Sequence, residues 1–159
     1  MAQAVEKWGR VDILVNNAGI LRDKSFVKMT MDDFQLVVDV HLIGSANCTK
    51  AVWELMRGQG YGRVVMTTSS SGMYGNFGQA NYGAAKMAAV GLFNTLVLEG
   101  DKYDIKLNCL SPTAGTRMLH VLLTDQFSAV LTVESVTTWL LTLCDNDAPN
   151  HTIFCPGAG

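Results

Sequence analysis

Tyr82 and Lys86 stand four positions apart in a segment whose pattern predicts a helix over residues 79–99. Side chains at i and i+4 of a helix project from one face, so these two would be neighbours. A free phenol has a pKa of about 10 and is a poor acid or base at neutral pH. A nearby ammonium favours the phenolate, which makes the pair a candidate proton donor and acceptor. An exposed pair on a helix surface has the same spacing and remains the alternative.

Ser69 lies 13 residues before Tyr82, directly after an apolar run that predicts a strand over residues 63–68. In open α/β sheets, ligands bind at the carboxyl ends of the strands. A hydroxyl there can hydrogen-bond a substrate oxygen and hold it for the proton of Tyr82. The neighbouring Ser70 and Ser71 are interpreted as turn residues.

A second polar sequence, Asn16-Asn17-Ala18-Gly19, also follows an apolar run, at residues 11–15. That run predicts a strand buried on both faces, as in a parallel sheet. Small, flexible residues at a strand end allow close approach by a ligand, here the adenosine side of a dinucleotide. An ordinary Asn/Gly turn is the alternative.

These residues must be positioned by alternating helices and strands. Strands are predicted at residues 11–15, 63–68, 105–110 and 152–155, and helices at 1–8, 30–57, 79–99 and 135–144, with a Ser/Gly-rich loop at 69–78. The alternation predicts βαβ crossovers. We therefore expect an α/β fold with a Rossmann-like, doubly wound parallel sheet.

The expected sheet is incomplete. A doubly wound dinucleotide fold normally opens with a strand, a Gly-rich turn over the pyrophosphate and an acidic residue after the second strand. The sequence contains neither G-x-G-x-x-G nor T-G-x-x-x-G-x-G; Gly58, Gly60 and Gly62 come closest but follow a predicted helix. We treat residues 1–159 as a single truncated domain that lacks the first βαβ units.

Composition narrows the classes of function. The chain is 48% hydrophobic with a net charge of −2, which gives no general attraction to nucleic acid or anionic membranes. No stretch approaches the roughly 20 apolar residues that span a bilayer. The four cysteines, Cys48, Cys109, Cys144 and Cys155, lack the spacing of a metal site. We expect them to be buried thiols of an intracellular protein that binds no metal.

Together these features resemble the short-chain dehydrogenase/reductase family. The strand and Asn-Asn-Ala-Gly at residues 12–19, Ser69, the Tyr82-x-x-x-Lys86 motif and the strand ending at residues 108–112 follow the family's order and spacing. The resemblance covers essentially the whole chain. It implies an oxidoreductase that uses NAD or NADP, the selecting residue being absent, to interconvert a secondary alcohol and a ketone.

The resemblance also implies roles for individual residues. Tyr82 would be the general acid/base, and Lys86 would lower its pKa and bind the nicotinamide ribose. Ser69 would orient the substrate carbonyl. The residues implied on the adenine and carboxamide sides of the cofactor are Asn16, Asn17, Ala18, Gly19, Pro112 and Thr116.

Two positions depart from the family pattern. His41 stands three residues before Gly44, where the family commonly has an Asn that holds a water in the proton relay. An imidazole also donates and accepts, so His41 is either a substitute relay residue or a packed helix histidine. Pro112-Thr113 replaces the usual Pro-Gly, which places the carboxamide contacts in question.

Within the family, residues 74–82, 112–118 and 156–159 resemble the 3-hydroxyacyl-CoA dehydrogenases of peroxisomal fatty-acid oxidation, which use NAD. This implies interconversion of (3R)-hydroxyacyl-CoA and 3-oxoacyl-CoA, and suggests a peroxisome by resemblance alone, the cytoplasm being the alternative. Acyl-carrier-protein reductases share G-N-x-G-Q-A-N-Y, so a 3-oxoacyl-acyl-carrier-protein substrate stays open.

The predicted helices near residues 32–57 and 79–99 are apolar on more than one side. In the family such helices form dimers, often within tetramers, and we expect the same here. Because the Gly-rich turn is missing, we expect the isolated 159-residue chain to be inactive or nearly so. The alternative function is an inactive fragment that hetero-oligomerises with full-length protein.

Overall fold

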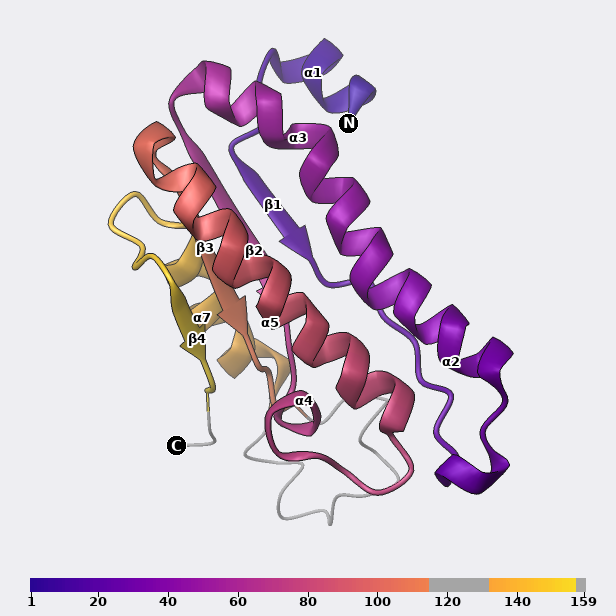
Figure 1. The fold of residues 1–159 in the computed structure, drawn as a ribbon. Helices are drawn as coiled ribbons and strands as arrows, with labels where there is room; N and C mark the ends of the chain where they lie inside the picture. The colour runs from indigo at the N-terminus through magenta and orange to yellow at the C-terminus, as the bar shows by residue number, and fades with distance from the viewer. Residues whose placement is uncertain (115–131, 157–159) are drawn as a thin grey trace.

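The computed structural model describes residues 1–114 and 132–156. Its centre is a four-stranded parallel sheet in the order β1-β2-β3-β4 (Figure 1). The strands are β1 (Ile13–Asn16), β2 (Gly62–Thr67), β3 (Ile105–Leu110) and β4 (Thr152–Phe154). The expected α/β, Rossmann-like parallel sheet is therefore confirmed.

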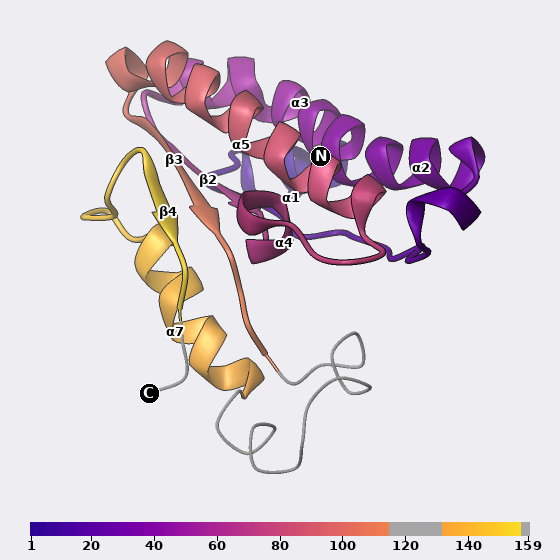
Figure 2. The ribbon, with the colours of Figure 1, turned by 60° about the horizontal axis from the view of Figure 1, so that its bottom comes forward.

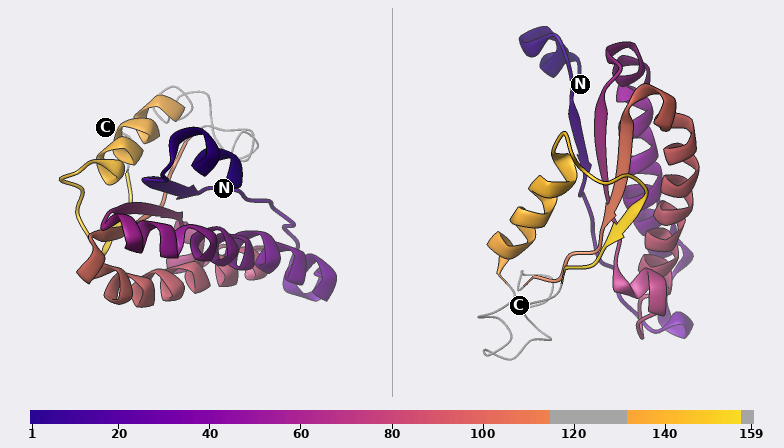
Figure 3. Two further views of the ribbon diagram at one scale, coloured as in Figure 1. Left: turned by 90° about the horizontal axis from the view of Figure 1, so that it is seen from above. Right: turned by 90° about the vertical axis from the view of Figure 1, so that its left-hand side faces the viewer.

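Helices cover both faces of this sheet. The helices α3 (Gly44–Gln59) and α5 (Ala80–Gly100) lie on one face, and α7 (Val133–Cys144) lies on the other (Figure 3). The remaining elements are α1 (Ala2–Trp8), η1 (Phe26–Lys28), α2 (Met31–Val38), the π-helical turn η2 (Asp39–Ile43), α4 (Ser70–Tyr74) and η3 (Asp101–Tyr103). In the part of the chain that the structure describes, no helix combines the length and the apolar character needed to cross a bilayer.

The two central strands explain why the core has two sides. Alternate residues of a strand face opposite sides of the sheet, so Val64 packs toward α3 and α5 and Val65 toward α7. The larger cluster joins Val52, Met56, Phe93 and Leu107, among others; the smaller joins Val65, Leu110 and Leu143. Burial is nearly continuous along β2 and β3, as expected for parallel strands covered on both faces.

The prediction that the first strand is buried on both faces is wrong for β1. Ile13 is 46% exposed and Val15 38% exposed, whereas Asn16 is buried. Neither Ile13 nor Val15 belongs to a core cluster of residues 1–114 and 132–156, whereas Leu14 packs against the larger one. Strand β1 is thus a half-covered edge strand.

Other predictions of local structure hold with changes. Thr30 caps α2, its Oγ1 accepting a hydrogen bond from Asp33 N at 3.1 Å, but the helix predicted to Arg57 is divided by the π-turn η2. The loop predicted over residues 69–78 contains α4.

The expectation of four buried thiols is wrong: Cys109 is buried and Cys144 half-buried, but Cys48 and Cys155 are exposed.

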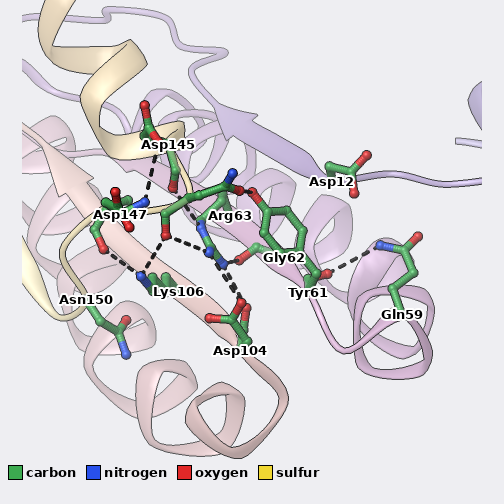
Figure 4. Close-up of polar contacts among 12 residues, drawn as sticks. Asp12, Gln59, Tyr61, Gly62, Arg63, Asp104, Lys106, Asp145, Asp147 and Asn150 are labelled. Carbon is green, nitrogen blue, oxygen red and sulfur yellow. Dashed lines mark hydrogen bonds and ion pairs between the residues drawn. The ribbon is translucent and has the colours of Figure 1, made fainter.

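A buried arginine anchors the amino-terminal end of the sheet (Figure 4). Arg63 is 1% exposed, and its guanidinium donates to the main-chain oxygens of Gly62, Asp104, Asp145 and Asn146. These contacts join the start of β2, the turn before β3 and the turn after α7. They hold the α7–β4 unit on the sheet, at the end opposite the polar strand ends described next.

Candidate active site

The sequence-predicted site residues gather at the carboxyl edge of the sheet. Strands β1 and β2 are parallel, with Asn16 opposite Met66, so residues 17–19 and 68–69 leave the sheet side by side. Pro112 follows β3 at the same edge and is half-buried. Tyr82 lies in the first turn of α5, and α4 packs against this helix (Figure 2).

Two glycines let α4 approach α5 closely, and this approach brings Ser69 to the site. A Cβ on Gly72 would lie 3.0 Å from Met87 N, and one on Gly83 would lie 2.9 Å from Ser71 O. Ser69 is the N-cap of α4, and its Oγ accepts a hydrogen bond from Ser71 N at 3.2 Å. The short helix therefore carries the Ser69 hydroxyl against the start of α5.

Tyr82 is half-buried and lies beside two of the other candidate residues, His41 and Lys86. Its ring stands edge-on to that of His41, with 5.1 Å between the ring centroids. Lys86 Nζ lies 5.5 Å from the Tyr82 ring centroid. The structure thus brings Ser69, Tyr82, Lys86 and His41 together.

The pKa of Tyr82 is raised above its ordinary value, chiefly by burial, while hydrogen bonding to the Ser69 side chain opposes the shift and the charge of Asp23 adds to it. The expected lowering of this pKa by Lys86 is not found. Lys86 Nζ turns to Thr67 O, and burial of the phenol dominates. At neutral pH the Tyr82 phenol therefore keeps its proton and can donate it.

Lys86 is 4% exposed, and burial lowers its pKa to about 8. Its Nζ donates to Thr67 O at 2.6 Å, the one hydrogen bond that the described residues provide for it. An ammonium has three donors, so two remain for acceptors brought by a ligand. This donor set fits the hydroxyls of a nicotinamide ribose.

His41 lies in the π-turn η2 and is 3% exposed. Its Nε2 is 2.8 Å from Ile20 O and 3.1 Å from Ile20 N, and the tautomer decides which contact is the hydrogen bond. Its Nδ1 is buried without a partner among the described residues. The pKa of His41 is lowered below its ordinary value, chiefly by burial of the ring, so the ring is neutral at pH 7.

The sequence from Asn16 to Gly19 divides into two groups. Asn16 is buried, and its Nδ2 donates to Thr49 Oγ1 at 3.0 Å, so it ties β1 to α3. Asn17, Ala18 and Gly19 are exposed at the strand end. A Cβ on Gly19 would lie 2.5 Å from His41 Cε1, so only glycine fits beside that ring.

Thr116 lies outside the described residues. Sequence reasoning missed Asn81, which is 0% exposed and contacts the Tyr82 main chain. An Asn directly before the tyrosine gives no signal of burial in sequence. In residues 1–114 and 132–156, no three His, Cys, Asp or Glu side chains cluster as metal ligands would.

Comparison with known proteins identifies the family of the chain. The family model for short chain dehydrogenases matches residues 1–126. The chain belongs to the short-chain dehydrogenase family. Members of this family are oxidoreductases that generally bind NAD or NADP.

Individual relatives are close in sequence. Peroxisomal multifunctional enzyme type 2 of Mus musculus is 46% identical over 157 residues, which cover 98% of this chain and 21% of that protein. A 3-oxoacyl-[acyl-carrier-protein] reductase of Synechocystis is 44% identical over 108 residues, 68% of this chain and 44% of that protein. The chain spans about a fifth of the length of the mouse relative.

The same likeness holds in three dimensions. The solved structure of full-length peroxisomal multifunctional enzyme type 2 from Drosophila melanogaster superposes with a TM-score of 0.83 at 44% identity. The superposition covers 92% of this chain and 26% of that one.

Proposed function

We propose that this chain carries the proton-transfer centre of a nicotinamide-dependent oxidoreductase that interconverts a secondary alcohol and a ketone. The observation that carries the proposal is the pairing of half-buried Tyr82 with Lys86, whose buried ammonium has unused donors. Tyr82 is the general acid/base, and Ser69 is the hydrogen-bond donor that orients the substrate oxygen.

In this proposal each side chain has a stated task at a stated atom. In ketone reduction, the Tyr82 phenol donates its proton to the substrate oxygen while the Ser69 hydroxyl holds that oxygen. Lys86 Nζ binds the cofactor ribose, and its charge stabilises the phenolate left on Tyr82. When bound, a nicotinamide cofactor supplies or accepts the hydride at the substrate carbon. Asn17, Ala18, Gly19 and Pro112 are proposed to contact the cofactor.

The proposed substrate is a 3-hydroxyacyl thioester, taken as (3R)-hydroxyacyl-CoA with NAD. The support is the identity to peroxisomal multifunctional enzyme type 2, together with the family resemblance of residues 74–82 in the sequence. A 3-oxoacyl-acyl-carrier-protein is the second substrate, supported by the identity to the Synechocystis reductase. Turnover with matched CoA and carrier-protein thioesters separates the two.

The proposal is tested first by calorimetric titration of NADH and then NADPH into the folded chain, followed by assays of 3-hydroxyacyl-CoA oxidation. In a form of the protein that turns over 3-hydroxyacyl-CoA, Tyr82→Phe should abolish turnover without loss of folding, and Tyr74→Phe, an exposed control, should retain it. Turnover in the Tyr82→Phe variant would refute the catalytic assignment.

A second function, an interaction subunit without turnover of its own, is favoured by one observation. Strand β1 leaves Ile13 and Val15 exposed at the sheet edge, and an apolar groove beside it is lined by Ala4, Leu14 and Val52 among others. Folded chain that binds neither NADH nor NADPH, and that co-elutes with a full-length homologue, would support this function instead.

A further inference from the structure

Asn81 has its whole side chain buried in the first turn of α5, directly before Tyr82. Both ends of its amide are used: Oδ1 accepts a hydrogen bond from Tyr82 N at 2.8 Å, and Nδ2 donates to Arg22 O at 3.2 Å. Burying an amide costs free energy unless it is hydrogen-bonded. The Asn81 side chain therefore joins α5 to the segment at Arg22. Loss of either hydrogen bond would cost free energy, because water does not easily replace it at a buried site.

The hydrogen bond to Arg22 is one of three that join residues 22–24 to residues 78–81; we call this set the clasp. Lys24 N donates to Gly78 O at 2.9 Å, and Gln79 Nε2 donates to Asp23 Oδ2 at 2.7 Å. The Gln79–Asp23 bond is exposed, whereas the Asn81–Arg22 bond is partly buried. Water competes less for the buried bond, so its loss costs most.

The first turn of α5 depends on Asn81 for a second reason. The first N–H groups of a helix have no acceptor within the helix, and Tyr82 N–H is one of them. Gln79, the N-cap residue, makes no side-chain capping bond. Asn81 Oδ1 takes that place and fixes the main chain of Tyr82 itself.

The segment around Arg22 also contacts Tyr82 indirectly, through His41. Two residues before Arg22, the main chain of Ile20 is hydrogen-bonded to His41 Nε2, and the His41 ring contacts the Tyr82 ring. The position of Tyr82 therefore depends on residues 20–22 in two ways: its main chain is linked to Arg22 through Asn81, and its ring is linked to Ile20 through His41. A shift of this segment relative to α5 would move the phenol.

We propose that Asn81 is a positioning residue for Tyr82: by tying the first turn of α5 to Arg22 O, it sets where the phenol stands between Ser69 and Lys86. Its consequence for turnover rests on the proposed function; its consequence for the placement of the phenol does not.

The placement is tested with protein whose tyrosines carry an NMR-active carbon isotope at the phenol carbon. The NMR signal of each tyrosine is followed as the pH is raised, which gives its pKa. The chain has four tyrosines, and the signal missing from Tyr82→Phe assigns Tyr82. In Asn81→Ala the phenol gains solvent, so its raised pKa should fall toward the ordinary value of about 10. Asn81→Ser, which keeps an acceptor for Tyr82 N–H, should restore part of the shift.

Asn47→Ala is the matched control, because Asn47 is exposed on α3, away from the clasp, and its side chain makes no hydrogen bond in the described part of the chain. It should leave the Tyr82 titration unchanged. An unchanged titration in folded Asn81→Ala overturns the proposal. If Asn81→Ala does not fold, Asn81→Ser decides, and failure of both to fold shows a structural role only and also overturns it.

Turnover, measured in a form of the protein that oxidises 3-hydroxyacyl-CoA, gives a separate readout. Asn81→Ala should lower kcat by about 10- to 100-fold, as expected for misplacement of a reacting group, with a much smaller change in KM. An equal rise in KM with unchanged kcat would contradict positioning. If Tyr82→Phe retains turnover but Asn81→Ala still shifts the titration, the proposed function fails and the placement stands.

Discussion

The imidazole of His41 stands perpendicular to the phenol ring of Tyr82, with an angle of 88° between the ring planes. Edge-to-face contact of this kind orients one ring by the other. The His41 ring is in turn fixed by Ile20, so the histidine acts as a bracket between the end of β1 and the first turn of α5. This geometry is compatible with both interpretations of His41, as packed ring and as relay residue.

The burial of His41 predicts how the free energy of unfolding depends on pH. The pKa of His41 is lowered from 6.5, so between that value and the folded pKa the unfolded chain binds more protons than the folded one. This contribution to stability is complete above about pH 6.5 and is lost as the pH falls. Denaturant unfolding at pH 7 and pH 5 should therefore show a smaller acid loss for His41→Phe than for wild type. Equal losses would show that His41 does not titrate as a buried neutral group.

The close approach of Gly19 to the His41 ring gives a second prediction. Gly19→Ala places a Cβ 2.5 Å from His41 Cε1, so the ring must move or the strand end must shift. We expect a loss of about 1–3 kcal/mol in the free energy of unfolding and a changed Tyr82 signal. Gly58→Ala is the control, because its Cβ meets nothing within 4 Å; in a helix it should stabilise by up to about 1 kcal/mol.

These contacts show where sequence reasoning stops. The apolar runs and caps predict β3 and the Thr30 cap correctly, because both depend on local pattern. The exposure of Val15 and the burial of Asn81 depend on what packs across the sheet or the clasp, which no local pattern records. The Tyr82 pKa was expected to fall from the spacing to Lys86, but burial of the phenol reverses the direction.

Lys86 predicts a rise in stability with pH. Its folded pKa of about 8 lies below the unfolded value of 10.5, so the cost of its buried charge is present below pH 8 and is relieved between pH 8 and 10.5. The shift corresponds to about 3 kcal/mol, and the lost bond to Thr67 O offsets about 1 kcal/mol of it. Lys86→Met should thus be more stable than wild type at pH 7, and should lack the alkaline rise. Lys50→Met, at an exposed site on α3, should behave like wild type in both respects.

Arg63 should be required for stability but not for the chemistry of Tyr82. Its buried guanidinium donates to four main-chain oxygens, and Arg63→Met leaves these acceptors without their partner, at a cost of about 3 kcal/mol in the free energy of unfolding. Arg10→Met removes an exposed arginine paired with Asp12 and should leave urea unfolding unchanged. Because Arg63 lies at the opposite end of the sheet, the folded Arg63→Met chain should keep the wild-type titration of Tyr82. A shifted titration would mean that the anchoring of α7 and β4 reaches the carboxyl edge, and that the two ends of the sheet are coupled.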